Sequence, residues 1–242
     1  MFAGHLGVGL AIGRAEPRVN VGLFVAAALL LDLVLWIFVL LGWESLSIPA
    51  DFAHWHQPAY TFPYSHGLVA CIGWSALAGA GVLAWHRRLG AGSLRVALLT
   101  AAAVFSHWLL DALVHRPELP LAGPGSGRIG LGLWQHMPVA LAVEAALAVV
   151  GLALYIPHSG LPRGRRIGLV ALTLVVGVFT VVGMTVAPAP PSAQAMAASS
   201  CITLAVVCGL AFWLRRVSDW RSSGVARKSR STARPWTRST AG

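Results

Sequence analysis

Charged residues are scarce in this chain: Asp, Glu, Lys and Arg make up 11% of its 242 residues, and only 8 residues are acidic. Soluble domains carry roughly 25% charged residues, so the composition excludes an ordinary soluble protein. Cysteine is also rare, and the spacing of the three cysteines fits neither a disulfide framework nor a zinc-finger motif. The sequence also contains no P-loop, no dinucleotide-binding glycine fingerprint and no Gly-x-Ser-x-Gly nucleophile elbow.

Long apolar stretches dominate instead, since 57% of the residues are hydrophobic and the mean hydropathy is +0.71. A stretch of about 18 or more apolar residues can cross a bilayer as a helix. Six such stretches predict an all-α, polytopic membrane bundle. They are residues 19–41, 67–86, 96–115, 138–157, 167–187 and 198–214.

Positive charges alternate between the loops that these spans define. Of the 18 Lys and Arg residues, only Arg116 and Arg128 fall in the loops after odd-numbered spans; the others precede the first span, follow the last, or lie in the loops between. Loops rich in Lys and Arg stay in the cytoplasm. We therefore expect both termini to be cytoplasmic.

The two ends of the chain differ from the spans. Residues 1–13 are apolar but too short to cross a membrane, which predicts either a surface helix or a half-helix buried against other helices. As a half-helix, the segment would carry His5 about 13 Å into the membrane from Arg14. The Arg-, Ser- and Thr-rich residues 217–242 predict a disordered cytoplasmic tail that binds anionic lipid headgroups and no nucleic acid. These features divide the chain into a four-helix core at 1–157, two further spans at 158–216, and the tail.

The third span carries an unusual polar stripe. His107, Asp111 and His115 follow one another at steps of four residues, so a helix places all three on one face. Ionisable side chains are expensive at membrane depth and usually mark a functional site. The stripe is the first candidate for such a site.

Other ionisable residues reach the same depth from other spans. At 1.5 Å per residue, Asp32, His107, Asp111 and Glu144 all lie about 18–24 Å from the cytoplasmic face. His66 and His115 are expected at the outer edge just above them. Burying ionisable side chains costs less free energy when they pair with one another than when each is buried alone. We therefore expect these residues to form one common site.

Mixed His and Asp ligand sets suit Zn, Mn or Fe. A shell of His107, Asp111 and Asp32 with either His5 or His66 would hold one divalent ion. Glu144 or His115 would then orient a ligand or act as general base. A buried hydrogen-bond network that only holds the helices together is the alternative interpretation.

Several of these residues stand in motifs of a known family. His5 lies in Gly-His-Leu-Gly-Val-Gly, Ser65 precedes His66, and Ser-His-Trp-x-x-Asp at 106–111 is followed by His-Arg-Pro at 115–117. Over residues 1–157 the chain resembles the YdjM-like bacterial inner-membrane proteins, which are described as metal-dependent hydrolases. The resemblance implies an inner-membrane location and a metal site. The residues that it implicates in that site are His5, Asp32, Ser65, His66, His107 and Asp111.

Two functions remain open from the sequence. The first is a metal-dependent hydrolase that acts from the outer leaflet on a lipid or lipid-linked ester or phosphoester. The second is a proton- or ion-coupled transporter that uses the same His, Asp and Glu side chains. Secondary transporters usually have broken helices and inverted repeats; the sequence shows neither, which favours the hydrolase.

Overall fold

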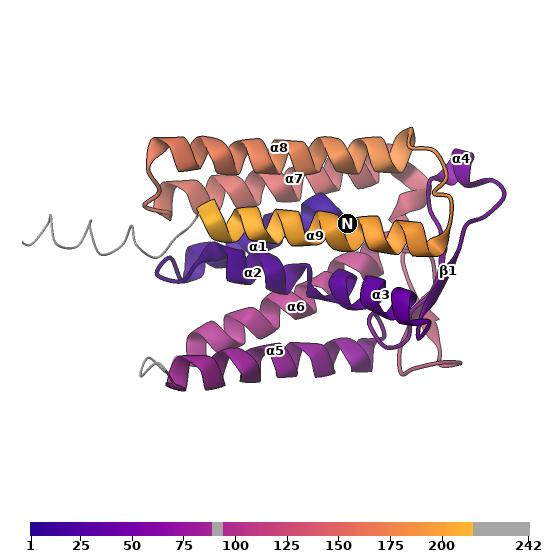
Figure 1. Cartoon of the computed structure of the whole chain (residues 1–242), viewed down its shortest axis with the longest axis horizontal. Coiled ribbons are helices and arrows are strands. Elements are labelled where there is room, and N and C mark those ends of the chain that lie inside the picture. The colour runs from indigo at the N-terminus through magenta and orange to yellow at the C-terminus, as the bar shows by residue number, and fades with distance from the viewer. Residues whose placement is uncertain (89–93, 215–242) are drawn as a thin grey trace, which may run out of the picture.

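A computed structural model describes residues 1–88 and 94–214, which form a bundle of helices with two small β-hairpins at one end (Figure 1). The helices are α1 (Phe2–Ala15), α2 (Val21–Ala28), α3 (Leu30–Leu41), α4 (Phe52–Trp55), α5 (Leu68–Arg88), α6 (Leu94–Val114), α7 (Met137–Tyr155), α8 (Arg163–Thr185) and α9 (Ala193–Leu214). The antiparallel hairpins pair β1 (Ser45–Ser47) with β2 (Ala59–Thr61), and β3 (Leu119–Pro120) with β4 (Arg128–Ile129). Single 3-10 turns, Leu133–His136 and Ile156–His158, flank α7.

Five helices, α5 to α9, are long and apolar enough to cross a membrane. The consecutive helices α2 and α3 provide a sixth crossing if the pair is counted as one span. The predicted all-α membrane bundle is confirmed, and the spans start and end within a few residues of the predicted limits. The division of the chain at residue 157 stays a prediction, and the predicted tail at 217–242 lies outside the described residues.

The first span differs from the continuous helix that was expected over residues 19–41. It is bent by 51° between α2 and α3, at Leu29. The local sequence, Ala27 to Leu31, contains no proline or glycine that would explain a kink. The expectation that this chain has no broken helix is therefore wrong, and the cause of the break must lie in tertiary contacts.

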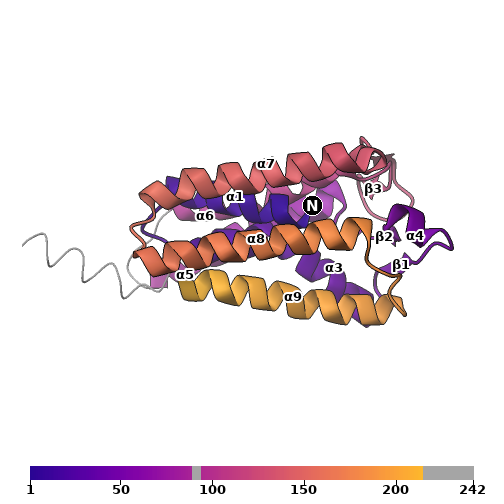
Figure 2. The same cartoon turned by 90° about the horizontal axis from the view of Figure 1, so that it is seen from above.

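The N-terminal segment forms the buried half-helix, not the surface helix. α1 has 14 residues and is packed between α7, α2 and α6, with His5, Leu6 and Leu10 fully buried. Its first residue lies midway along the bundle in both views (Figures 1 and 2). A helix this short can lie at membrane depth because its backbone is covered by protein instead of lipid.

Glycines allow α1 and α7 to approach closely. A Cβ atom added to Gly151 on α7 would collide with the backbone of Gly7, and one added to Gly7 would collide with the backbone of Leu147. Small residues at such a contact let two helix backbones touch, which is a common way of packing helices in membranes. This contact fixes the position of α1, and with it His5, against the rest of the bundle.

The basic loops gather at one end of the bundle. The α1–α2 and α7–α8 connections share that end with the last turn of α5, the first turn of α6 and the C-terminal end of α9, and both β-hairpins lie at the other end (Figures 1 and 2). We call these the basic end, which carries Arg14, Arg87 and Arg163, and the hairpin end. The alternation of charge along the sequence thus corresponds to two ends of one bundle.

Candidate metal centre

Helix α6 supplies the two central residues of a buried cluster. His107 and Asp111 are one helical turn apart and both lie inside the bundle, with exposures of 0% and 2%. Their side chains meet, since His107 Nε2 lies 3.1 Å from Asp111 Oδ2. The predicted stripe therefore faces the protein interior.

The break in the first span orients the His107 ring. His107 Nδ1 lies 2.7 Å from the carbonyl oxygen of Ala28, the last residue of α2. A carbonyl only accepts, so Nδ1 carries the proton and donates it. The Nε2 lone pair of His107 is then free and points into the cluster, which is the orientation of a metal-ligating histidine.

A second histidine is oriented by a relay from the hairpin end. Glu44 Oε1 accepts the backbone N–H groups of Tyr64 and Ser65, at 2.8 Å each, and so holds Ser65 in place. The Ser65 hydroxyl lies 2.8 Å from His66 Nδ1 and forms a hydrogen bond with it. In the tautomer in which His66 Nδ1 donates to Ser65 Oγ, His66 Nε2 presents its lone pair, 3.2 Å from His107 Nε2.

Burial raises the pKa of the Glu44 carboxyl, and the hydrogen bonds from Ser65 and Tyr64 oppose this effect. Glu44 lies outside the spanning helices, just after α3, and is only 4% exposed. The Glu44 carboxyl fixes the backbone of Ser65, and the Ser65 hydroxyl in turn fixes the His66 ring.

Helix α1 contributes a third imidazole. The His5 ring stacks on that of His107, with 3.7 Å between centroids and 6° between planes. His5 Nε2 lies 3.2 Å from Asp111 Oδ1. Its Nδ1 is buried without a hydrogen-bond partner in the described part of the chain, so His5 is held mainly by the packing of α1.

Asp32, at the start of α3, completes the cluster. Its Oδ1 lies 3.6 Å from His107 Nε2 and 3.8 Å from His66 Nε2. Its side chain is 23% exposed, whereas that of Asp111 is 3% exposed. Asp32 is therefore the carboxylate that solvent or a ligand reaches first.

The geometry of the cluster could hold a metal ion. Two overlapping sets, His5–Asp32–His107 and His66–His107–Asp111, each place their ligand atoms within 4.8 Å of one another. Ligands at about 2.0–2.2 Å from one ion lie roughly 3–4 Å from each other. The separations between ligand atoms of these residues, from 3.1 Å (His107 to Asp111) to 3.8 Å (His66 to Asp32), lie in that range. Because His107 Nε2 belongs to both sets and has one lone pair, the cluster suits one ion better than two.

Glu144 and His115 lie beside this cluster in different roles. Glu144 Oε2 accepts the N–H groups of Ala3 and Gly4, at 3.1 and 3.4 Å, and so caps the buried start of α1. The Met1 nitrogen, at the same end, is 3.4 Å from Asp111 Oδ1. His115 Nδ1 bonds Glu118 at 2.7 Å, and its Nε2 lies 3.9 Å from Asp111 Oδ2.

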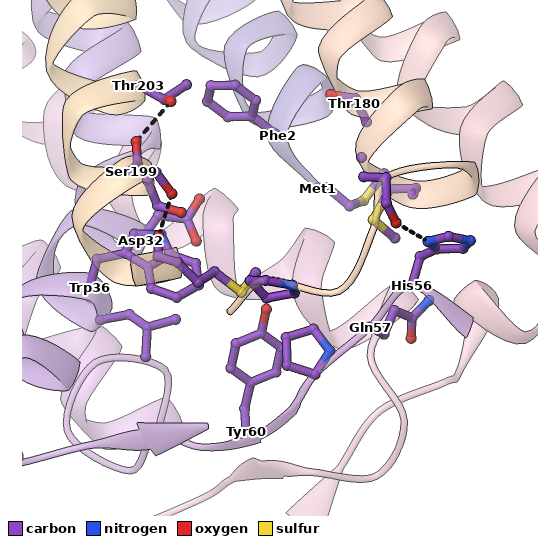
Figure 3. Close-up of a pocket in the computed structure, with 18 of the residues that line it drawn as sticks. Met1, Phe2, Asp32, Trp36, His56, Gln57, Tyr60, Thr180, Ser199 and Thr203 are labelled. Carbon is purple, nitrogen blue, oxygen red and sulfur yellow. Dashed lines mark hydrogen bonds between the residues drawn. The ribbon is translucent and has the colours of Figure 1, made fainter. Parts of the chain in front are cut away.

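The cluster forms the floor of a cavity of about 610 Å³. Asp32, His66, Asp111, His115 and Glu144 all line it, and most of the remaining lining is apolar. Figure 3 shows its two walls, with Ser199 and Thr203 of α9 on one side and Thr180 of α8 on the other. Ligand pockets usually have this size, an apolar lining and a few converging polar groups.

The structure thus brings His5, Asp32, His66, His107 and Asp111 together, including both histidines between which the sequence did not choose. Sequence reasoning missed Glu44 and the Ala28 carbonyl. Glu44 could have been noticed as a rare acidic residue close to a span end, but its partner Ser65 is 21 residues away. The Ala28 carbonyl leaves no signal in a sequence.

Comparison of the chain with protein-family models, with curated proteins and with solved structures gave no match. The resemblance to YdjM-like proteins therefore remains a prediction. The site has to be interpreted from its own chemistry.

Proposed function

We propose that this chain is a membrane-embedded, metal-dependent hydrolase of the YdjM-like type, acting on a lipid or lipid-linked ester or phosphoester. One observation carries the proposal: the Nε2 atoms of His66 and His107 lie 3.2 Å apart, while both Nδ1 atoms are engaged elsewhere. Two lone pairs at that separation repel unless a proton or a cation lies between them. The two aspartates beside them favour positive charge at this place, and their oxygens can ligate a metal ion.

The residues that would hold the ion are His5, Asp32, His66, His107 and Asp111. Their imidazole and carboxylate donors suit Zn, Mn or Fe. Such an ion, when bound, lowers the pKa of a water ligand to about 7 and so supplies a nucleophile at neutral pH.

His115 is placed to move a proton at the edge of the cluster. Its Nδ1 faces Glu118, a carboxylate that accepts the Nδ1 proton and leaves the Nε2 lone pair free. Since His115 lines the cavity, this Nε2 can act as general base toward a bound substrate. Glu144 is a positioning residue, because it holds the start of α1 and thereby His5.

The proposal includes the location. We place the basic end in the cytoplasm of a bacterial cell and the cavity, which opens near the hairpin end, toward the outer leaflet of the inner membrane. The proposed partner of the basic tail is anionic lipid on the cytoplasmic leaflet.

Metal analysis of the full chain tests the proposal. Protein purified in detergent without chelator should contain close to one equivalent of Zn, Mn or Fe, and should hydrolyse bis(p-nitrophenyl) phosphate or p-nitrophenyl butyrate in micelles. Chelation should remove the activity and re-addition of the metal should restore it. Protein that carries no metal and takes up none of the three ions on titration would overturn the proposal.

A second function is supported by the broken span. Transporters use interrupted helices to place ion sites at membrane depth, and here the break between α2 and α3 lies directly at His107. A metal-free protein that acidifies or alkalinises liposomes when a solute gradient is applied would favour a proton-coupled transporter.

A further inference from the structure

Helices α8 and α9 touch at one end and separate at the other. At the basic end, a Cβ atom added to Gly168 of α8 would lie 2.8 Å from Leu214 of α9. Nearer the hairpin end, an added Cβ atom at Gly183 of α8 meets no atom within 4 Å, and Gly183 lines the cavity. The cavity therefore lies where the two helices diverge.

The edges of this gap are exposed at membrane depth. Phe179 of α8, which lines the cavity, is 55% exposed, and Ser199 on the α9 side is exposed as well. On α9, Ile202 and Val206 are also exposed, on a helix that is apolar enough to cross a membrane. A gap between two spanning helices with such outer faces opens into hydrocarbon, not into water.

The walls of the gap suit an apolar chain in spite of their hydroxyl groups. Thr180 Oγ1 donates to Val176 O at 2.9 Å, and Thr203 Oγ1 donates to Ser199 O at 2.9 Å. These hydroxyl donors are satisfied within their own helices, so they require no polar ligand. Phe2 and Phe179, 6.0 Å apart, add an aromatic surface.

The length of the apolar wall and the position of the polar residues also suit a lipid. Thr203 is ten residues from the start of α9 at Ala193, so the wall extends about 15 Å along the helix. The polar residues Asp32 and His66 line the same cavity (Figure 3 labels Asp32). One side of the cavity is thus reactive and polar, and the other is apolar and open to lipid.

From this arrangement we infer that the gap between α8 and α9 is a lateral entrance and binding groove for one acyl chain of a bilayer glycerophospholipid. The chain lies along α8 and α9, and the ester region of the lipid lies against the Asp32–His66 side. This inference builds on the proposed function by naming the part of the substrate that is bound and its route of entry. The groove does not need the metal to bind a chain, so the two can fail separately.

Two glycines of α8 provide a matched pair for the test. Added Cβ atoms at Gly183 and Gly177 both meet nothing within 4 Å, but only Gly183 lines the cavity. The full chain is reconstituted in vesicles that contain phosphatidylglycerol with a photoactivatable diazirine at the end of one acyl chain. Labelled sites are then mapped by mass spectrometry in wild type, Gly183→Phe and Gly177→Phe.

In wild type and Gly177→Phe, we expect labels on the cavity residues Met196 and Leu204 as well as on the outer residues Ile202 and Val206. In Gly183→Phe, labelling of the cavity residues should be lost while the outer labels persist, which also shows that α9 of the variant is inserted in the bilayer. Labels confined to the outer face in wild type would overturn the inference. So would disulfide-linked dimers of Gly183→Cys without cavity labelling, because a second copy would then cover the gap.

Unchanged metal content in Gly183→Phe separates this result from the proposed function. If wild type binds metal but its cavity is never labelled, the groove is refuted and the metal site stands. If the cavity is labelled but no metal binds, the groove stands and the hydrolase is refuted.

Discussion

His107 Nδ1 donates a hydrogen bond of 2.7 Å to the carbonyl oxygen of Ala28, across the break between α2 and α3. The same hydrogen bond therefore links the bend at Leu29 to the orientation of the His107 ring. A buried carbonyl needs a partner, and the imidazole provides it from a different helix. The same bond leaves His107 Nε2 directed at Asp111, His66 and Asp32.

The central ligands should be indispensable for metal binding. We expect His107→Ala and Asp111→Ala each to weaken metal affinity by more than the roughly 10–100-fold typical of residues that only support a ligand. His86→Ala, at the basic end of α5, is the control and should keep the wild-type metal content. Metal content after dialysis, measured by inductively coupled plasma mass spectrometry, distinguishes the variants. Equal retention in His107→Ala and His86→Ala would contradict the site.

The Ser65 hydroxyl should affect metal affinity, because it orients the His66 ring. In Ser65→Ala the His66 ring loses the hydrogen-bond partner of its Nδ1 atom, and metal affinity should fall about 10–100-fold. Ser75→Ala is a matched control, since Ser75 is a buried serine whose hydroxyl donates to the Cys71 carbonyl of its own helix. Competition titration with a chromogenic chelator measures both. A loss of affinity of the same size in Ser75→Ala would show a general packing effect instead.

The close contact of α1 and α7 should be intolerant of a single methyl group. Gly151→Ala forces the two backbones apart, because the added Cβ collides with Gly7, and should cost about 1–3 kcal/mol of stability. It should also weaken metal binding by displacing His5. Gly209→Ala in α9, where nothing lies within 4 Å, should lower neither the melting temperature in detergent nor the metal content.

The buried Glu44 carboxyl predicts a pH effect on stability. Burial raises its pKa in the folded protein, so the folded state holds this proton more tightly than the unfolded state does. The stabilisation is complete below the unfolded pKa of about 4.3 and is lost as pH rises through the higher folded value. Glu44→Gln cannot ionise, so the stability of wild type relative to this variant should decrease between pH 4 and pH 8. A difference that does not change with pH would contradict this assignment.

Orientation in the membrane can be tested by reporter fusions. The loops at 42–63 and 188–194 both lie at the hairpin end and should report the outside of the membrane (Figure 1). Alkaline phosphatase fused in either loop should be active, and green fluorescent protein at the same place should be dark. A fluorescent fusion in either loop would reverse or break the topology.

The bundle was predictable because its signals are local. Each span is a continuous apolar stretch, so the limits of α5 to α9 follow from hydropathy alone, and charge alternation separates the two ends of the bundle. The site was predictable in part, since the step of four residues from His107 to Asp111 is a property of any helix. Asp32 and Glu144 could be placed at the same depth by counting residues, but depth does not say which way a side chain points.

The sequence by itself therefore determined the class of protein, the number of apolar spans and the set of ionisable residues at membrane depth. Only the tertiary structure decided that α1 is buried, that the first span breaks at Leu29, and that both His5 and His66 join His107. These outcomes depend on contacts between residues far apart in the chain, such as Gly7 with Gly151 and Glu44 with Ser65. The physical reason is that a buried polar group must find a partner wherever the fold provides one, and the fold provided these partners from other helices and loops.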